Sequence, residues 1–152
     1  MTSGQEWLRW LRDAEQCLDG ARGAVQQGHW RSVCLMAQLA IELAAKAVIA
    51  AFVEPHWTHD PSGQLRAGVL ARSDEEIEAV FGADACGAIE RLAGDVAETA
   101  EWHGWATYGR RLPDRTWRAA ADVCTEDAAR DLLLRAERSV ATAARLRIHA
   151  KP

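Results

Sequence analysis

One stretch of 21 residues, 33–53, contains only three polar side chains and constrains the fold more than any other part of the chain. These are Gln38, Glu42 and Lys46, each four positions after the one before. At 3.6 residues per turn, this spacing places them in one narrow stripe along a helix whose remaining surface is apolar or small. Such a helix is buried on nearly all sides, so other groups of the protein must satisfy its polar stripe.

The same stretch is long enough to cross a membrane. Glu42 and Lys46 near its centre would each cost about 2.5–3.5 kcal/mol on insertion scales, so a buried bundle helix explains the pattern at lower cost. The first residues of the chain carry mixed charges and no apolar core, which does not match a signal peptide. We therefore expect no membrane segment and a cytoplasmic location.

Composition favours a single helical domain covering residues 1–152. Hydrophobic residues make up 49% of the chain, Ala and Leu dominate them, and β-branched residues are few. The four cysteines stand singly, without the short spacing of a zinc site or of a redox dithiol. We predict an all-α domain that keeps its thiols reduced and needs no disulfides.

Start and stop signals divide the chain into helical segments. Capping boxes of the form S-x-x-E begin at Ser3 and Ser73, Asp60 precedes a proline at a helix start, and Thr125 caps the last helix. The expected helices cover about residues 3–28, 30–53, 60–71 (a short one), 73–82, 84–103, and the segment after Thr125. Residues 104–124 look irregular, and no segment shows the period-two alternation of a strand. The prediction is an antiparallel, up-and-down bundle of about five helices.

Three patterns together resemble the HEPN domain family over roughly residues 7–145. They are W-L-x-x-A-E at residues 10–15, A-Q-x-A-x-E-x-A-x-K-A at residues 37–47, and the T-H-D turn at residues 58–60. An aromatic–Arg–Pro–Asp region of such proteins resembles residues 108–114, YGRRLPD. The resemblance implies a five-helix bundle, commonly a homodimer. It also implies a minimal nucleotidyltransferase encoded nearby, the two proteins behaving as toxin and antitoxin.

Many members of that family are RNases that carry an Arg, four to six further residues, and a His, usually with a polar residue after the Arg. Here the only pair at that spacing is Arg22 and His29, and a glycine follows Arg22. His149 follows Arg145 too closely to qualify. The RNase signature is therefore missing, and the resemblance does not predict cleavage by that motif.

Two neighbouring groups are candidates for a binding site. Glu42 and Lys46 have the i, i+4 spacing of a helical ion pair, which is either structural or leaves Lys46 available for a phosphate or nucleotide. In the T-H-D turn, we expect Asp60 to cap the following helix beside Thr58. His59 has the only environment that suits catalysis, because its neighbour in the sequence is a carboxylate able to pair with a protonated imidazole.

The histidines also allow a metal site to be considered. His56 and His59 stand three apart, and His103 is the only candidate for a third ligand. Without a further ligand in sight we predict no metal and no cofactor.

The densest basic cluster comes late in the chain. The net charge is −4, yet residues 110–152 carry an excess of basic side chains. Arginine forks suit phosphates and aromatic rings offer stacking surfaces for bases, although the same segment also fits a solvated loop that pairs with acidic neighbours. The cluster consists of Tyr108, Arg110, Arg111, Arg115 and Arg118, with Trp117 among them.

These patterns together predict a binding and interaction module. Its partners would be a second copy of the chain, a nucleotidyltransferase, or RNA or a nucleotide held by the late basic cluster and the T-H-D turn, which the resemblance brings together. The first alternative is an RNase with a degenerate site, in which His59 is the base and Arg110 or Arg111 stabilises the phosphorane. The second is a small-molecule pocket walled by some of the seven tryptophans.

Overall fold

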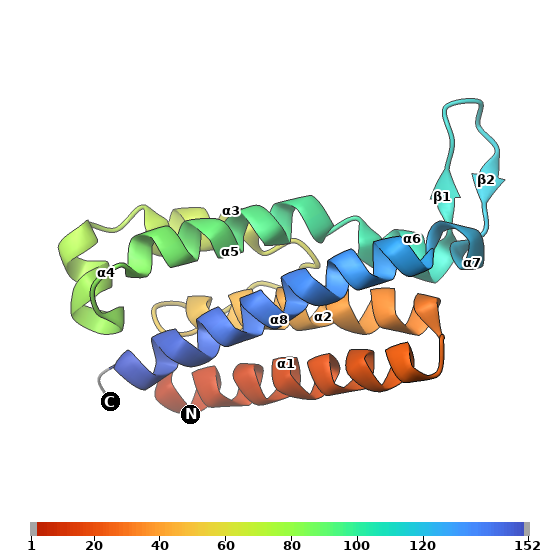
Figure 1. Ribbon diagram of the computed structural model, residues 1–152. Helices are drawn as coiled ribbons and strands as arrows, with labels where there is room; N and C mark the ends of the chain where they lie inside the picture. The colour runs from red at the N-terminus through yellow and green to blue at the C-terminus, as the bar shows by residue number, and fades with distance from the viewer. Residues whose placement is uncertain (1–2, 151–152) are drawn as a thin grey trace.

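A computed structural model describes residues 3–150 as a bundle of antiparallel helices with one projecting hairpin (Figure 1). The central helix α2 (Trp30–Ile49) packs against α1 (Ser3–Gln26) and α8 (Glu126–His149). A second layer, led by α5 (Ala85–Thr99), covers α2 and α8. The predicted all-α bundle is confirmed.

Helix α2 is enclosed as its composition predicts. The polar stripe is as deeply buried as the apolar positions, with Gln38, Glu42 and Lys46 only 1%, 4% and 6% exposed. The helix is long and apolar enough to span a membrane by length and composition, and 72% of its most apolar window is buried inside the bundle. In this fold, α1, α5 and α8 provide the apolar surroundings that its sequence requires.

Helix α1 buries one face against α2. Its buried side chains recur every three or four residues, which places them in one row along the helix. The row starts at Trp7, whose ring lies 5.3 Å from that of Phe81, centroid to centroid. The helix ends before Gly28, whose φ of +68° is a conformation that favours glycine and allows the sharp turn into α2.

Two of the four predicted helix N-caps are confirmed and two are not. Ser73 and Thr125 accept hydrogen bonds from the backbone N–H groups of Glu76 and Ala128, so both caps are confirmed. Ser3, in contrast, already lies inside α1 rather than in front of it. Asp60 does not occupy the cap position, which belongs to Pro61. Its Oδ1 instead accepts hydrogen bonds from the backbone N–H and the hydroxyl of Ser62.

Several predicted boundaries were wrong. The second helix ends at Ile49 rather than Val53. The predicted helix 60–71 is split into α3 (Ser62–Leu65) and a π-helix, η1 (Arg66–Leu70), which precede α4 (Asp74–Phe81). The predicted helix 84–103 ends at Thr99, and a separate helix, α6 (Trp102–Tyr108), follows. The backbone N–H and C=O groups at the ends of a helix have no hydrogen-bond partners within the helix. The position of a helix end therefore depends on tertiary packing, which the periodicity of the sequence does not reveal.

The expected absence of strands was also wrong. Residues predicted to be irregular form a hairpin of β1 (Arg110–Arg111) and β2 (Trp117–Arg118), followed by α7 (Ala120–Val123). The strands are antiparallel, with Arg110 opposite Arg118 and Arg111 opposite Trp117. Strands of two residues are too short to show an alternating pattern. The hairpin projects from the end of the bundle opposite the two chain termini (Figure 1).

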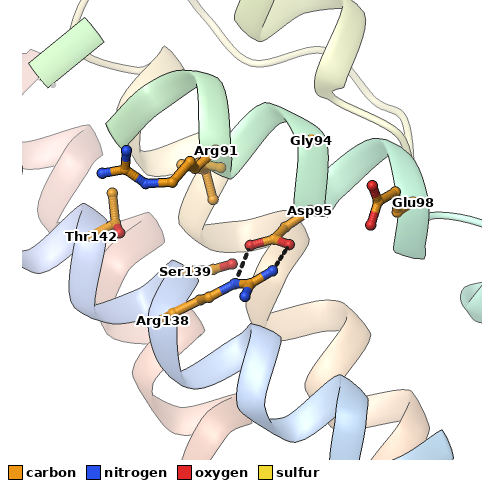
Figure 2. Close-up of a pocket in the computed structure, with 8 residues that line it drawn as sticks. Arg91, Gly94, Asp95, Glu98, Arg138, Ser139 and Thr142 are labelled. Atoms are coloured by element: carbon orange, nitrogen blue, oxygen red, sulfur yellow. Dashed lines mark hydrogen bonds and ion pairs between the residues drawn. The ribbon is translucent and has the colours of Figure 1, made fainter. Parts of the chain in front are cut away.

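A buried carboxylate joins α5 to α8. Asp95 is 5% exposed, and both of its oxygens accept hydrogen bonds from the guanidinium of Arg138 (Figure 2). Arg135 also donates to Asp95, at 3.5 Å, and to Glu98. A pocket of about 360 Å³ lies beside this cluster, between Arg91, Thr142 and the buried Ser139. Because each charged group of the Asp95 cluster has a partner, we assign it a structural role.

Candidate functional site

The polar stripe of α2 is the base of the candidate site. The Lys46 ammonium donates a hydrogen bond to Oε1 of Glu42 at 2.9 Å, which confirms the predicted ion pair. The Gln38 side-chain amide donates to the other oxygen, Oε2, at 3.3 Å. Both oxygens of this buried carboxylate are therefore engaged within α2, as a charge held out of water requires.

Two histidines from distant parts of the chain cover the stripe. His59 Nδ1 lies 3.2 Å from Oε2 of Glu42, and His103 Nδ1 lies 3.3 Å from Oε1 of Gln38. A carboxylate and an amide oxygen only accept, so each Nδ1 carries its proton and donates. The two rings stack on each other, with centroids 3.6 Å apart and planes inclined by 16°. His59 comes from the T-H-D turn and His103 from the first turn of α6.

A pocket of about 500 Å³ opens beside His59. The side chain of Lys46 lies on its wall, with its nitrogen 5.5 Å from the centre of the Trp10 ring. Trp57 lies at the same pocket and is fully exposed. The lining therefore includes two tryptophans and charged side chains of both signs. The residues that line the pocket are Glu6, Arg9, Trp10, Glu42, Leu43, Lys46, Glu54, Pro55, His56, Trp57, Thr58 and His59.

The histidine pair makes the stability of this site pH-dependent. Burial of the ring is the larger cause that lowers the pKa of His103, electrostatic interaction with the neighbouring His59 ring is the second, and Glu42 acts in the opposite direction. The unfolded chain therefore binds a proton at this residue more readily than the folded protein does. The contribution of His103 to stability is complete above about pH 6.5 and is lost as the pH falls through the lower pKa of the folded state.

We expect the melting temperature of the wild type to fall more steeply between about pH 7 and pH 5 than that of His103→Gln. Thermal unfolding followed by circular dichroism across this range measures the difference. His56→Gln is the matched control, because His56 lies in the same loop as His59 and outside the stacked pair; it should keep the wild-type slope. Parallel curves for His103→Gln and wild type would contradict the assignment.

The late basic cluster forms a second site on and beside the hairpin. Tyr108 and Trp117 are 78% and 63% exposed, and the guanidinium carbon of Arg110 lies 4.2 Å from the centre of the Trp105 ring. An open pocket of about 560 Å³ lies here, lined by Glu101, Gly104, Trp105, Tyr108, Gly109, Arg110, Arg111 and Trp117. The hairpin turn is closed locally, where Asp114 Oδ1 accepts from the backbone N–H and hydroxyl of Thr116. These hydrogen bonds lower the pKa of Asp114.

The two clusters predicted to converge lie in different pockets. His59 and Thr58 line the pocket beside α2, whereas Tyr108, Arg110 and Arg111 line the pocket of the hairpin. Helix α6 separates them, since His103 at its start meets His59 and Tyr108 is its last residue. The step of five positions from His103 to Tyr108 corresponds to a rise of about 7.5 Å along the helix. Arg110 and Arg111 thus belong to a site of their own.

Gln38 and His103 were noticed in the sequence but not chosen as site residues: Gln38 as part of the polar stripe, and His103 as a third metal ligand beside His56 and His59. Gln38 belonged to the predicted stripe, and its buried amide could have been identified from that spacing. The contacts of His103 with Gln38 and with the His59 ring follow no local pattern, because they depend on the packing of α6 on α2. Arg22, of the single Arg–His pair at RNase spacing, instead contacts the carboxylates of Asp19 and Glu137.

Comparison with known proteins identifies the family of the chain. The family model of the HEPN domain matches residues 7–143, which is most of the chain. The chain belongs to the HEPN domain family. No curated protein and no solved structure matches it. HEPN domains are in general RNases or modules associated with nucleotidyltransferases, and the all-α bundle around α2 is consistent with a helical HEPN domain.

Proposed function

We propose that this HEPN domain is an RNA-binding module that contacts single-stranded RNA through residues 108–118, here called the arm. The observation that carries the proposal is the arm's set of four arginines, none of which has an ion pair within residues 3–150. They are Arg110, Arg111, Arg115 and Arg118. Cations without an acidic partner on a projecting element are available for phosphates.

The aromatic side chains of the arm favour a single strand over a duplex. Tyr108 and Trp117 expose most of their surface and can stack on bases that are not paired. Arg110 is held over Trp105, so its charge is oriented before a ligand arrives. The only acidic residue within the arm, Asp114, is occupied by Thr116. Because the chain is acidic overall, its attraction for RNA is confined to the arm.

Trp117→Ala should weaken binding of a short fluorescent RNA without secondary structure by about 1–3 kcal/mol, because one stacking surface is lost. Arg111→Ala should weaken binding and reduce the slope of log K against log salt by about 0.7, the value for one phosphate contact on a single strand. Fluorescence anisotropy at several salt concentrations measures both effects. Arg130→Ala is the control, since Arg130 pairs with Glu126 on α8, outside the arm.

Equal losses in Arg130→Ala and the arm variants would overturn the RNA proposal, as would failure of the wild type to bind at low salt. His59→Ala should retain binding, because His59 lies in the other pocket. If His59 is also a catalytic base, this variant would keep binding and lose any cleavage of the same RNA.

The assemblies implied by the family are part of the proposal: a homodimer and a complex with a nucleotidyltransferase, the latter acting as a toxin–antitoxin pair. A specific observation supports a protein contact. Trp57 is fully exposed and Val53 is 37% exposed in the loop between α2 and α3, where both line pockets that also contain Glu6 and Arg9 of α1. Native mass spectra of the protein purified from its host would identify a second copy, a nucleotidyltransferase or RNA, and a bare monomer would contradict all three.

A further inference from the structure

The structure assigns a metal-binding site that the T-H-D turn and the polar stripe form with α6. We propose that Glu42, His59 and His103 bind one divalent first-row transition ion, for which Zn²⁺ is the best fit. One ligand atom from each residue lies within 4.8 Å of the other two. Two imidazole nitrogens and one carboxylate oxygen form a common three-residue set for such ions, with a further position left for water.

The spacing of the ligand atoms matches zinc coordination. Zinc bonds of about 2.0–2.1 Å in tetrahedral geometry place neighbouring ligand atoms about 3.3 Å apart. His59 Nδ1 and Glu42 Oε2 are 3.2 Å apart in the protein. A metal ion between them would replace the proton on Nδ1, and the His59 ring would carry its proton on Nε2 instead.

Metal binding would require one of the two stacked histidine rings to rotate. Because the planes are inclined by only 16° and the centroids are 3.6 Å apart, the nitrogen lone pairs lie in two separate, nearly parallel planes, so the rings must turn for both to converge on one ion. His59 has room to turn, because 60% of its side chain is exposed. His103 is held more firmly within the bundle, so we expect His59 to move and the stacking to be lost when metal binds.

The proposed ligands are oriented by hydrogen bonds and are accessible from a pocket, as in known metal sites. The Gln38 amide bridges two of the ligands, donating to Oε2 of Glu42 while its oxygen accepts from His103. Such contacts orient ligands and raise metal affinity. His59 also lines the pocket of about 500 Å³, which provides an entry path and space for a bound water.

Lys46 gives the proposal a distinctive signature. Its ammonium occupies Oε1 of the Glu42 carboxylate, so it leaves Oε2 for the ion yet places a positive charge close to it. Removing that charge by Lys46→Met should therefore tighten metal binding. A variant that strengthens binding is hard to explain by general damage to the fold.

Cysteines are the main competing ligands for zinc in this chain. Burial raises the pKa of the Cys34 and Cys124 thiols, so the thiolates that zinc requires are scarce near neutral pH. Co²⁺ distinguishes the two kinds of site, because thiolate ligands give an intense charge-transfer band and nitrogen and oxygen ligands do not.

The test is titration of the chelator-treated protein with Zn²⁺ by calorimetry and with Co²⁺ by absorption. We expect one ion per chain without a thiolate band, and a loss of affinity of about tenfold or more in His59→Gln and in His103→Gln. His56→Gln is the matched control and should bind as the wild type does. Glu42→Gln leaves a buried ammonium unpaired and Lys46→Met leaves a buried carboxylate without its counter-charge, so both can weaken the fold. The histidine variants therefore carry the test, and the affinity of Lys46→Met is compared only after circular dichroism shows that the variant is folded.

The proposal is overturned by several results. They are a wild type that binds no metal, histidine variants that bind as tightly as the wild type, a thiolate band in the Co²⁺ spectrum, and an equal loss in His56→Gln. RNA binding by the arm does not depend on this site, so failure of either proposal leaves the other standing.

Discussion

Glu42→Met should lower the free energy of unfolding by about 3–5 kcal/mol, because it leaves the Lys46 ammonium buried without its counter-charge. Lys46 is 6% exposed, and its nitrogen donates to Glu42 Oε1 at 2.9 Å. The same substitution also removes the acceptor of the His59 Nδ1 proton. Urea unfolding followed by circular dichroism gives the loss in stability.

The chain contains a matched control for this prediction. Glu126 and Arg130 on α8 have the same i, i+4 spacing and the same 2.9 Å separation, but their side chains are about half exposed. Glu126→Met should cost at most about 1 kcal/mol, since water screens an exposed pair and solvates a cation left alone. The difference between the two variants therefore isolates the effect of burial on an ion pair of one geometry.

The double variant Glu42→Met/Lys46→Met should recover most of the stability lost by Glu42→Met. Replacement of a buried ion pair by apolar side chains of similar size is often neutral or stabilising, because neither charge then has to be taken out of water. If the double variant is as unstable as the single one, the loss comes from the packing or the His59 contact and not from an unpaired ammonium.

The sequence was sufficient to predict the bundle because the signal for its central helix is local. Gln38, Glu42 and Lys46 recur every four residues, and this spacing alone places their side chains on one face of an enclosed helix. The ion pair between Glu42 and Lys46 follows from the same spacing. Both features depend on backbone geometry within two turns of one helix.

The second half of the candidate site was not predictable in the same way. His59 and His103 are separated by 44 positions, and they stack only because the loop before α3 and the start of α6 both pack over α2. Helix α6 is short and contains Gly104, so it has no strong helical period of its own. The long-range packing that brings these residues together leaves no pattern in neighbouring residues.

Gly109→Ala should detach the arm from the bundle. Gly109 has a φ of +92°, and a Cβ there would clash with the backbone carbonyl oxygen of Arg118, closer than Cβ atoms approach other atoms in proteins. Strain in such a backbone conformation costs about 1–3 kcal/mol, and relief of the clash requires β1 and β2 to separate. We expect faster hydrogen exchange at Arg110 and Arg118, which lie opposite each other in the hairpin, and weaker binding of RNA by the arm.

Gly104→Ala is the control, because it makes the same glycine-to-alanine change at a nearby position where an added Cβ meets no other atom. Gly104 lies five residues earlier, within α6, and a Cβ there would have no heavy atom within 4 Å. Alanine is the better helix former, so this variant should gain about 0.5–1 kcal/mol of stability and keep the arm in place. Hydrogen exchange at Arg118 that is equal in the two variants would contradict the role of Gly109.

If the arm detaches in Gly109→Ala and RNA affinity stays at the wild-type value, the hairpin geometry does not matter for binding, and the arginines act only as charges on a flexible segment.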